Sequence, residues 1–216
     1  MVLNETDRKT RDERLSQLVK YCMISGALDL NLYAEYDVKR GLRESDGKGV
    51  LTGLTEISDV TGFKTIQGEK VPCEGELYYQ GYNVMDLKKG FKQRRFNFEE
   101  VTYLLLFGAL PDKQQLREFI DLLNQYRELP SKFVRDVIMK APSLNIMNAL
   151  QRSVLTLYSY DENPDDISIE NVLRQALTLI ATMPLTSVYA YHAYQHYHND
   201  QSLVIRYPDP ELSTAE

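Results

Sequence analysis

Residues 75–111 read GELYYQGYNVMDLKKGFKQRRFNFEEVTYLLLFGALP, and this stretch decides the fold. It predicts an extended segment, a turn and an amphipathic helix with both ends marked. Asn97 is a suitable N-cap, and Glu100 follows at the spacing of a capping-box acid. Gly108 can take the left-handed conformation after the last turn, and Pro111 prevents the helix from continuing. We therefore predict a helix that begins at Asn97 and ends before Gly108.

Four further helical patterns follow, each with a capping residue ahead of apolar side chains at helical spacing. The predicted caps are Asp112, Ser131, Ser143 and Ser168. Pro184 falls inside the last pattern, where a proline removes a backbone hydrogen bond and clashes with the preceding turn. We therefore expect Pro184 to kink or end that helix, with another helical stretch over residues 185–198.

The chain before these helices has a different pattern. Residues 54–82 combine repeated glycines with short apolar runs, which is typical of short extended pieces and at most one small hairpin. Residues 7–24 alternate charged and apolar side chains in a 3.6-residue pattern and predict an amphipathic helix. No convincing domain boundary is present. The sequence therefore predicts a mostly α, multi-helix fold over residues 1–216, with a short β segment near residues 54–82.

The acidic composition narrows the classes of partner. Among 216 residues, 31 Asp and Glu outnumber 25 Lys and Arg, giving a formal net charge of −6. A general nucleic-acid binder needs a basic surface, so that class is disfavoured. Cys22 and Cys73 are too far apart to suggest a metal pair or a disulfide framework, and free thiols fit a reducing compartment. We expect a cytoplasmic protein.

One long run without charge raises the question of a membrane. Residues 175–199 contain no Asp, Glu, Lys or Arg. Pro184, three histidines and several Thr and Tyr make the run too polar for lipid. We interpret it as a helix buried in protein, and the first residues of the chain lack the apolar core of a signal peptide.

For each group of candidate site residues, we favour a structural interpretation over a functional one. His192 and His196 are four residues apart and would share a helix face, but a zinc site needs three or four ligands and His198 points elsewhere. The turn DGKG at residues 46–49 is not followed by the helix that a phosphate-binding loop requires. Ordinary helix and turn residues are the favoured interpretation of both.

Two charged runs also have both a functional and a structural interpretation. A basic run just before the first predicted helix could meet the phosphates of an anionic cofactor, although a solvated turn is favoured; it comprises Lys88, Lys89, Lys92, Arg94 and Arg95. An acidic run has the wrong ligand order for a calcium loop and is interpreted as a solvated loop; it comprises Asp161, Glu162, Asp165 and Asp166.

GELYYQGYNVMDL followed by FEEVTYLLLFGALP resembles the amino-terminal signature of the citrate synthase family. GLTEISDV, from Gly53, and MPLTSVYAY, from Met183, fit the same family in the same order. Two positions depart from the family pattern. Gln80 stands where the family usually has Arg, and Ala141-Pro142-Ser143 replaces an H-P-M-like segment.

The resemblance implies an enzyme that condenses acetyl-CoA with oxaloacetate and releases CoA, or the related 2-methylcitrate synthase. In the family a His and an Asp handle the methyl proton and a second His polarises the oxaloacetate carbonyl. These residues belong to motifs downstream of an S-x-A-E-N-F-like segment, and the sequence ends within that segment at Glu216. We therefore expect no catalytic residue and no metal ligand in this chain, no cofactor beyond acetyl-CoA as a substrate, and no assignable substrate-binding residue.

The end of the sequence supports a further expectation. Ser213 and Glu216 have the spacing of a capping box, which announces the start of a helix. We expect the chain to be the amino-terminal part of the large domain of a longer protein. A free-standing helical interaction module without enzymatic activity is the competing hypothesis.

The expected partner is a second copy of the same chain. A helix without charge on any side is usually buried on all sides, and the corresponding helices form much of the dimer interface in citrate synthases. We expect a homodimer formed through helices within residues 143–198, with neither nucleic acid nor membrane as a partner.

Overall fold

The computed structural model describes residues 29, 31–36, 41–43, 49, 55–91 and 94–216. The chain divides into two compact units, Met1–Thr55 and Glu56–Glu216. In the first unit, α2 (Asn31–Glu35) begins where the Asn31 backbone N–H donates to the Asp29 carboxylate at 2.9 Å. An isolated antiparallel bridge joins Arg43 to Gly49. The helix predicted over residues 7–24, Cys22 and most of the turn at 46–49 lie outside the described residues.

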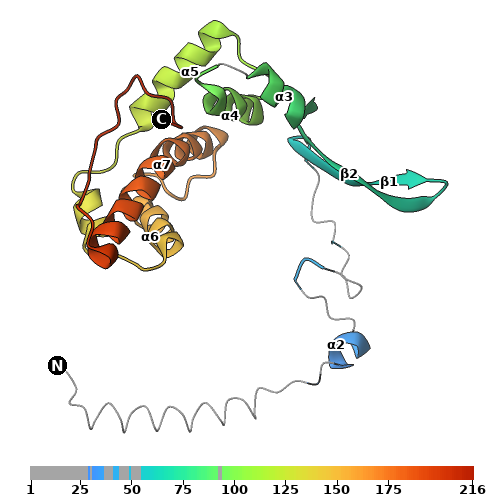
Figure 1. Ribbon diagram of the computed structural model, residues 1–216, viewed down its shortest axis with the longest axis horizontal. Coiled ribbons are helices and arrows are strands. Elements are labelled where there is room, and N and C mark those ends of the chain that lie inside the picture. Colours follow the sequence, from blue (N-terminus) through green and yellow to red (C-terminus); the bar gives the residue numbers. More distant parts are fainter. Residues whose placement is uncertain (1–28, 30, 37–40, 44–48, 50–54, 92–93) are drawn as a thin grey trace. The chain divides into compact units, whose positions relative to one another are not determined.

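The second unit opens with a small antiparallel sheet (Figure 1). Strands β1 (Ser58–Ile66) and β2 (Glu69–Tyr79) pair from Ser58 opposite Tyr79 to Ile66 opposite Glu69. Strand β3 (Tyr82–Asn83) adds a short third strand beside β2. The predicted β segment near residues 54–82 is confirmed. Its hairpin is longer than expected, and Gln67 and Gly68, which both take positive φ, form the tight turn between the strands.

The helix predicted to begin at Asn97 is present as α4 (Asn97–Phe107), after the short α3 (Val84–Gly90). The predicted cap is wrong, because Phe96 occupies the N-cap position and no side chain caps the helix. Glu100 instead accepts a hydrogen bond from Arg94 Nη1 at 2.7 Å, because the guanidinium brings a full positive charge that a backbone N–H lacks. The end is as predicted: Gly108 is left-handed, with φ 80°.

Two of the four downstream caps are confirmed. Asp112 forms a complete capping box with Gln115 at the start of α5 (Lys113–Tyr126). Ser168 accepts from the Asn171 backbone N–H at the start of α7 (Ile169–Asn199).

The other two predicted caps are wrong. Asn145, not Ser143, caps α6 (Ile146–Tyr158), and the Ser143 hydroxyl accepts from the Asn145 N–H one step earlier. Ser131 lies in a tight turn that leads into η1 (Val134–Met139), which is a π-helix. In both places the serine lies in a turn that precedes the helix, so the helix starts later than the sequence suggests.

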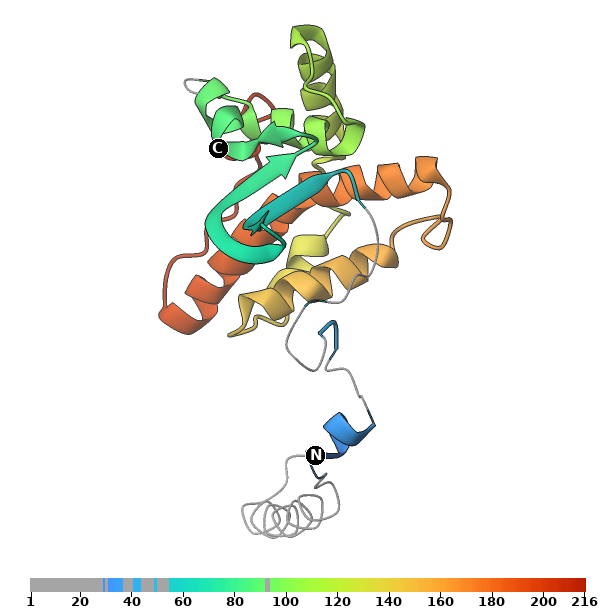
Figure 2. The same ribbon diagram turned by 90° about the vertical axis from the view of Figure 1, so that its right-hand side faces the viewer.

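Helix α7 continues through Pro184 (Figure 2). Of the two expected outcomes, a kink or an end, the end is wrong, because one helix covers both predicted stretches. Hydroxyls on either side of the proline donate to carbonyls one turn back: Thr182 to Thr178 O at 2.7 Å and Ser187 to Met183 O at 2.7 Å. Packing of α7 against α5, α6 and η1 holds the helix together across the missing hydrogen bond.

The core lies along the buried side of α7. One cluster joins α7 to η1 and α6 and contains Phe133, Ile138, Ala149, Tyr189, Ala190 and Ala193. The other joins α7 to α5 and contains Phe119, Leu123, Leu177 and Ala181. The other side of α7 is not fully covered, because Val188 is 52% exposed. The predicted mostly α fold is confirmed.

Candidate functional site

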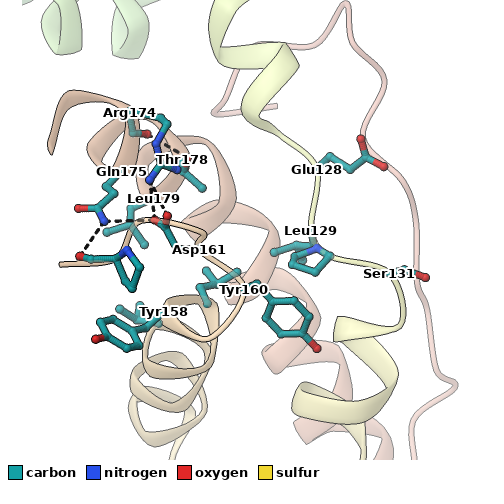
Figure 3. A pocket seen from close by; sticks show the side chains of 14 residues that line it. Glu128, Leu129, Ser131, Tyr158, Tyr160, Asp161, Arg174, Gln175, Thr178 and Leu179 are labelled. Atoms are coloured by element: carbon teal, nitrogen blue, oxygen red, sulfur yellow. Dashed lines mark hydrogen bonds and ion pairs between the residues drawn. The ribbon is translucent and has the colours of Figure 1, made fainter. Parts of the chain in front are cut away.

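A cavity of about 540 Å³ opens between the α6–α7 loop and the segment that follows α5 (Figure 3). We call it the α6–α7 cavity. Its walls are mostly apolar and come from α6, α7 and both connecting segments. The apolar lining includes Leu129, Pro130, Val154, Leu157, Pro164 and Leu179, with Tyr158 and Tyr160 at its margin.

One end of this cavity is closed by an ion pair. Arg174 Nη2 donates to both carboxylate oxygens of Asp161, at 2.6 and 2.8 Å. Gln175 Nε2 donates to Asp161 Oδ2 at 3.1 Å and to Pro164 O at 3.1 Å. The Asn163 backbone N–H, followed by Arg174 and Gln175, lowers the pKa of Asp161 below its ordinary value. Asp161 is therefore an ionised acceptor whose oxygens are occupied, which suits a structural role better than proton transfer.

The acidic loop that contains Asp161 is ordered by its own side chains. The Asp161 side chain is only 15% exposed. Asp166 accepts from the Ser168 backbone N–H at 2.9 Å, and Asn171 Nδ2 donates to the carbonyls of Asn163 and Asp166. Glu162, Asp165 and Asp166 are exposed, which agrees with the interpretation of this run as a solvated loop, whereas Asp161 is largely buried and the hydrogen bonds fix the path of the loop. Asp165 accepts from the Tyr158 hydroxyl and raises the pKa of that tyrosine.

A second polar cluster ties the last residues of the chain to α4. The buried Glu99 carboxylate accepts from the Thr214 backbone N–H at 2.7 Å, while its other oxygen is buried without a partner among the described residues. Glu216 accepts from the Ser213 backbone N–H at 3.0 Å and from Arg95 Nε at 2.6 Å. The predicted capping-box pair is thus in contact through the Glu216 side chain.

The same segment is also attached to α5. Arg127 donates to Leu212 O at 3.1 Å, and Asn124 Nδ2 donates to Pro210 O at 2.8 Å. More than 80 residues separate the partners in each of these contacts. Sequence reasoning missed them because no local spacing signals a pair so far apart.

The comparisons with known proteins identify the family. The family model for the citrate synthase C-terminal domain matches residues 42–216. The chain belongs to the citrate synthase family. It is 33% identical over 184 residues to citrate synthase of Haloferax volcanii, covering 83% of this chain and 41% of that protein. It is 28% identical over 152 residues to 2-methylcitrate synthase 1 of Corynebacterium glutamicum, covering 70% of this chain and 35% of that protein.

Solved structures agree on the fold. Citrate synthase of Pyrobaculum aerophilum superposes with a TM-score of 0.59 at 28% identity, covering 81% of this chain and 42% of that one. The chain therefore spans less than half the length of the relatives it matches. The resemblance carried by residues 75–111 is confirmed.

The histidines of this citrate synthase-family chain lie near the end of α7 and do not converge. His196 Nδ1 is 2.9 Å from Gln201 O, and the ring of His198 packs against Tyr194. Within the described ranges no group of three or more His, Cys, Asp or Glu side chains could hold a metal ion.

The basic run is largely paired with carboxylates. Lys89 contacts Asp86 at 2.9 Å, Arg94 contacts Glu100, and Arg95 contacts Glu216. Lys88 lines a smaller pocket of about 260 Å³ beside Tyr79 and Asn97. Lys92 lies outside the described residues. The contacts that are described support the structural interpretation of this run.

The positions that depart from the family pattern are not among the residues that line the α6–α7 cavity. Gln80 takes positive φ, 47°, in the turn between β2 and β3. Ala141-Pro142-Ser143 forms the connection between η1 and α6.

Cys73 is a free thiol on β2. None of the described helices combines the length and hydropathy needed to cross a membrane.

We predict that acid weakens the contact of Glu216 with Arg95, just before α4, and with Ser213. Arg95, then the Ser213 N–H and hydroxyl, lower the pKa of Glu216 from 4.5 to about 2. Because the folded-state pKa is depressed, the stabilisation is present above pH 4.5 and is lost as the pH falls towards 2. The measurement is the thermal midpoint of the parent minus that of Glu216→Gln. This difference should be positive above pH 4.5 and vanish near pH 2.

Glu211→Gln removes a nearby carboxylate that makes no such contact and serves as the control. A parent-minus-Glu216→Gln difference that stays constant over this pH range, or one that Glu211→Gln reproduces, would contradict the prediction.

Proposed function

We propose that the full-length protein is a citrate synthase that condenses acetyl-CoA with oxaloacetate and releases citrate and CoA in the cytoplasm. The observation that supports the proposal is the family match over residues 42–216, with relatives named citrate synthase. The related enzyme of Thermoplasma acidophilum was solved as a ternary complex with carboxymethyl coenzyme A and oxaloacetate, and its likeness to this chain is one of fold, with a TM-score of 0.56 at 22% identity. Acetyl-CoA serves as a substrate, and the proposal includes no separate cofactor.

In this proposal, the 216-residue chain contributes scaffold rather than catalytic groups. Forming an enol from a thioester requires a base and an acid positioned together. Asp161 is already held by Arg174, and His196 faces Gln201 near the end of α7. These contacts support a reaction centre built from residues outside this chain.

The choice of acyl group has a specific alternative. Two relatives from Corynebacterium glutamicum are named 2-methylcitrate synthases, so propionyl-CoA is the competing substrate. The two acyl groups differ by one methylene, which a pocket distinguishes by about 1–3 kcal/mol, or roughly 10–200-fold in kcat/KM. Comparing the two substrates therefore decides between the two activities.

The activity experiment compares the complete gene product with the 216-residue chain. Each is incubated with oxaloacetate and either acetyl-CoA or propionyl-CoA, and the release of free thiol is followed. We expect the complete gene product to turn over acetyl-CoA faster and the 216-residue chain to give no turnover above background. Turnover by the chain after repurification would overturn its role as scaffold. A complete gene product inactive with both substrates would favour the non-catalytic interaction module.

The proposal includes a homodimer formed through helices within residues 143–198. Large apolar side chains project from α6 at the spacing of one helix face: Met147 is 62% exposed and Leu155 is 73% exposed. Leu144, just before the helix, and Tyr158 extend the same face. An apolar stripe of this kind is typical of a helix that packs against another helix. Val188 adds an exposed apolar side chain on α7.

The association test places a charge in the proposed contact. Met147→Asp should convert the dimer to a monomer, because an unpaired carboxylate would be buried against apolar side chains. Val188→Asp tests whether α7 takes part in the same contact. Val60→Asp, on the exposed hairpin, is the matched control and should leave the dimer intact. Light scattering at high micromolar concentration measures the mass of each variant.

Two outcomes would contradict the homodimer proposal. A monodisperse monomer for the parent chain would rule out association of this chain. A Met147→Asp variant that remains fully dimeric would exclude the α6 face, and the same result for Val188→Asp would remove α7 from the contact.

A further inference from the structure

A second cavity, of about 680 Å³, lies beneath residues 203–210. We call these residues the strap and the space beneath them the strap cavity. The strap runs back from the end of α7 past η1 towards α5 (Figure 1). Two hydrogen bonds fasten it, from the Tyr189 hydroxyl to Arg206 O and from Asn124 Nδ2 to Pro210 O, both at 2.8 Å. The roof of the cavity is therefore fixed by contacts that are far apart in the sequence.

The segment Glu128–Ser131 separates the strap cavity from the α6–α7 cavity and lines both. In Figure 3, Leu129 points towards the α6–α7 cavity. Glu128 and Ser131 point away from it, towards the side on which the strap runs. The two cavities are thus distinct spaces on opposite sides of one segment.

Cations outnumber acids at the strap cavity. Its lining contains Arg127, Lys132 and Arg135 but only one acid, Glu128. Asp136 is bound by Arg135 at 2.7 Å, so including it still leaves an excess of one positive charge. Arg127 donates only to the neutral oxygens Leu212 O and Thr214 Oγ1. Its positive charge is therefore not compensated by a carboxylate among the described residues.

Lys132 is held in an unusual backbone conformation at this cavity. The Phe133 N–H donates to Pro130 O at 3.0 Å and closes a tight turn in which Lys132 has φ 65°. Glycine is favoured at such a position because it lacks the Cβ atom that is crowded there, and asparagine is tolerated because its side chain can hydrogen-bond to the local backbone. The next element, η1, is a π-helix, a form that is frequent at functional sites. The turn places an ammonium group where glycine would fit the backbone better.

The remaining walls are apolar and aromatic. The apolar lining includes Leu185 and Tyr189 of α7, Ile205 of the strap and Met139 of η1, and Leu185 and Ile205 pack against the core cluster that contains Tyr189. A space with cations at one part and apolar side chains elsewhere matches a ligand that has one charged group and one apolar body.

We propose that the strap cavity binds a small organic anion, an aryl or acyl phosphate or carboxylate. Its anionic group contacts Lys132 and Arg127, and its apolar body packs against Leu185 and Tyr189. This binding needs no catalytic activity, so it stands independently of the condensation reaction.

Isothermal titration of the 216-residue chain with 1-naphthyl phosphate and with 1-naphthoate tests the proposal, and the stronger ligand identifies the preferred anionic group. Lys132→Asn removes the charge while asparagine tolerates the left-handed backbone. Lys140→Gln is the matched control, because Lys140 ends η1 outside the cavity lining. We expect saturable binding that weakens at least about tenfold in Lys132→Asn and is unchanged in Lys140→Gln. Thermal unfolding confirms that both variants are folded.

Absence of saturable binding by the parent chain would overturn the proposal. Equal affinity of the parent and folded Lys132→Asn would also overturn it, as would an equal loss in Lys140→Gln. Inorganic phosphate is titrated alongside as the anionic group without a body. If it binds as tightly as 1-naphthyl phosphate, the apolar part of the site is wrong.

Discussion

Packing against α7 is the interaction on which the rest of the second unit depends. Helices α5 and α6 and the π-helix η1 all contact α7. Small side chains such as Ala181, Ala190 and Ala193 let these neighbours approach closely, while Leu177 and Tyr189 fill the spaces between them. The helix needs this packing, because Pro184 interrupts its own hydrogen bonds near the middle. Loss of this packing would therefore destabilise α7 and each of its neighbours together.

Both cavities follow from this arrangement. The connection between α5 and η1 crosses the surface of α7 with one cavity on each side of it. One cavity ends at the Asp161–Arg174 pair, which fixes the entry into α7, and the other is covered by the strap that leaves α7. The contacts at the two ends of α7 thus shape the two cavities that lie beside the middle of the helix.

The sequence predicted features that depend on nearby residues. The capping box at Asp112, the left-handed Gly108 and the helical class of the chain were all readable from local spacing. The predictions at Asn97 and Ser131 failed because another partner was available. Arg94 took the carboxylate of Glu100, and the turn before η1 took Ser131. Local spacing names a candidate cap but cannot rank it against competing hydrogen bonds.

The parts of the candidate sites that could not be predicted are those that join distant segments. Glu99 and Thr214 are 115 residues apart, and the strap cavity joins residues from α5, η1, α7 and the strap. The backbone conformation of Lys132 could not be predicted either, because a lysine in a sequence does not indicate a positive φ. The role of the acidic run at 161–166 in fastening α7 could not be predicted either, because it depends on the position of Arg174.

Native-state hydrogen exchange of the 216-residue chain tests the organising role of α7 most directly. Its buried middle, from Leu177 to Ala193, should contain the slowest-exchanging amides of the second unit, and buried amides of α5 and α6 should open with the same free energy. The β1–β2 hairpin, whose strands are largely exposed, should exchange faster. Amides in the middle of α7 that exchange as fast as the hairpin, while α5 and α6 stay protected, would contradict the account.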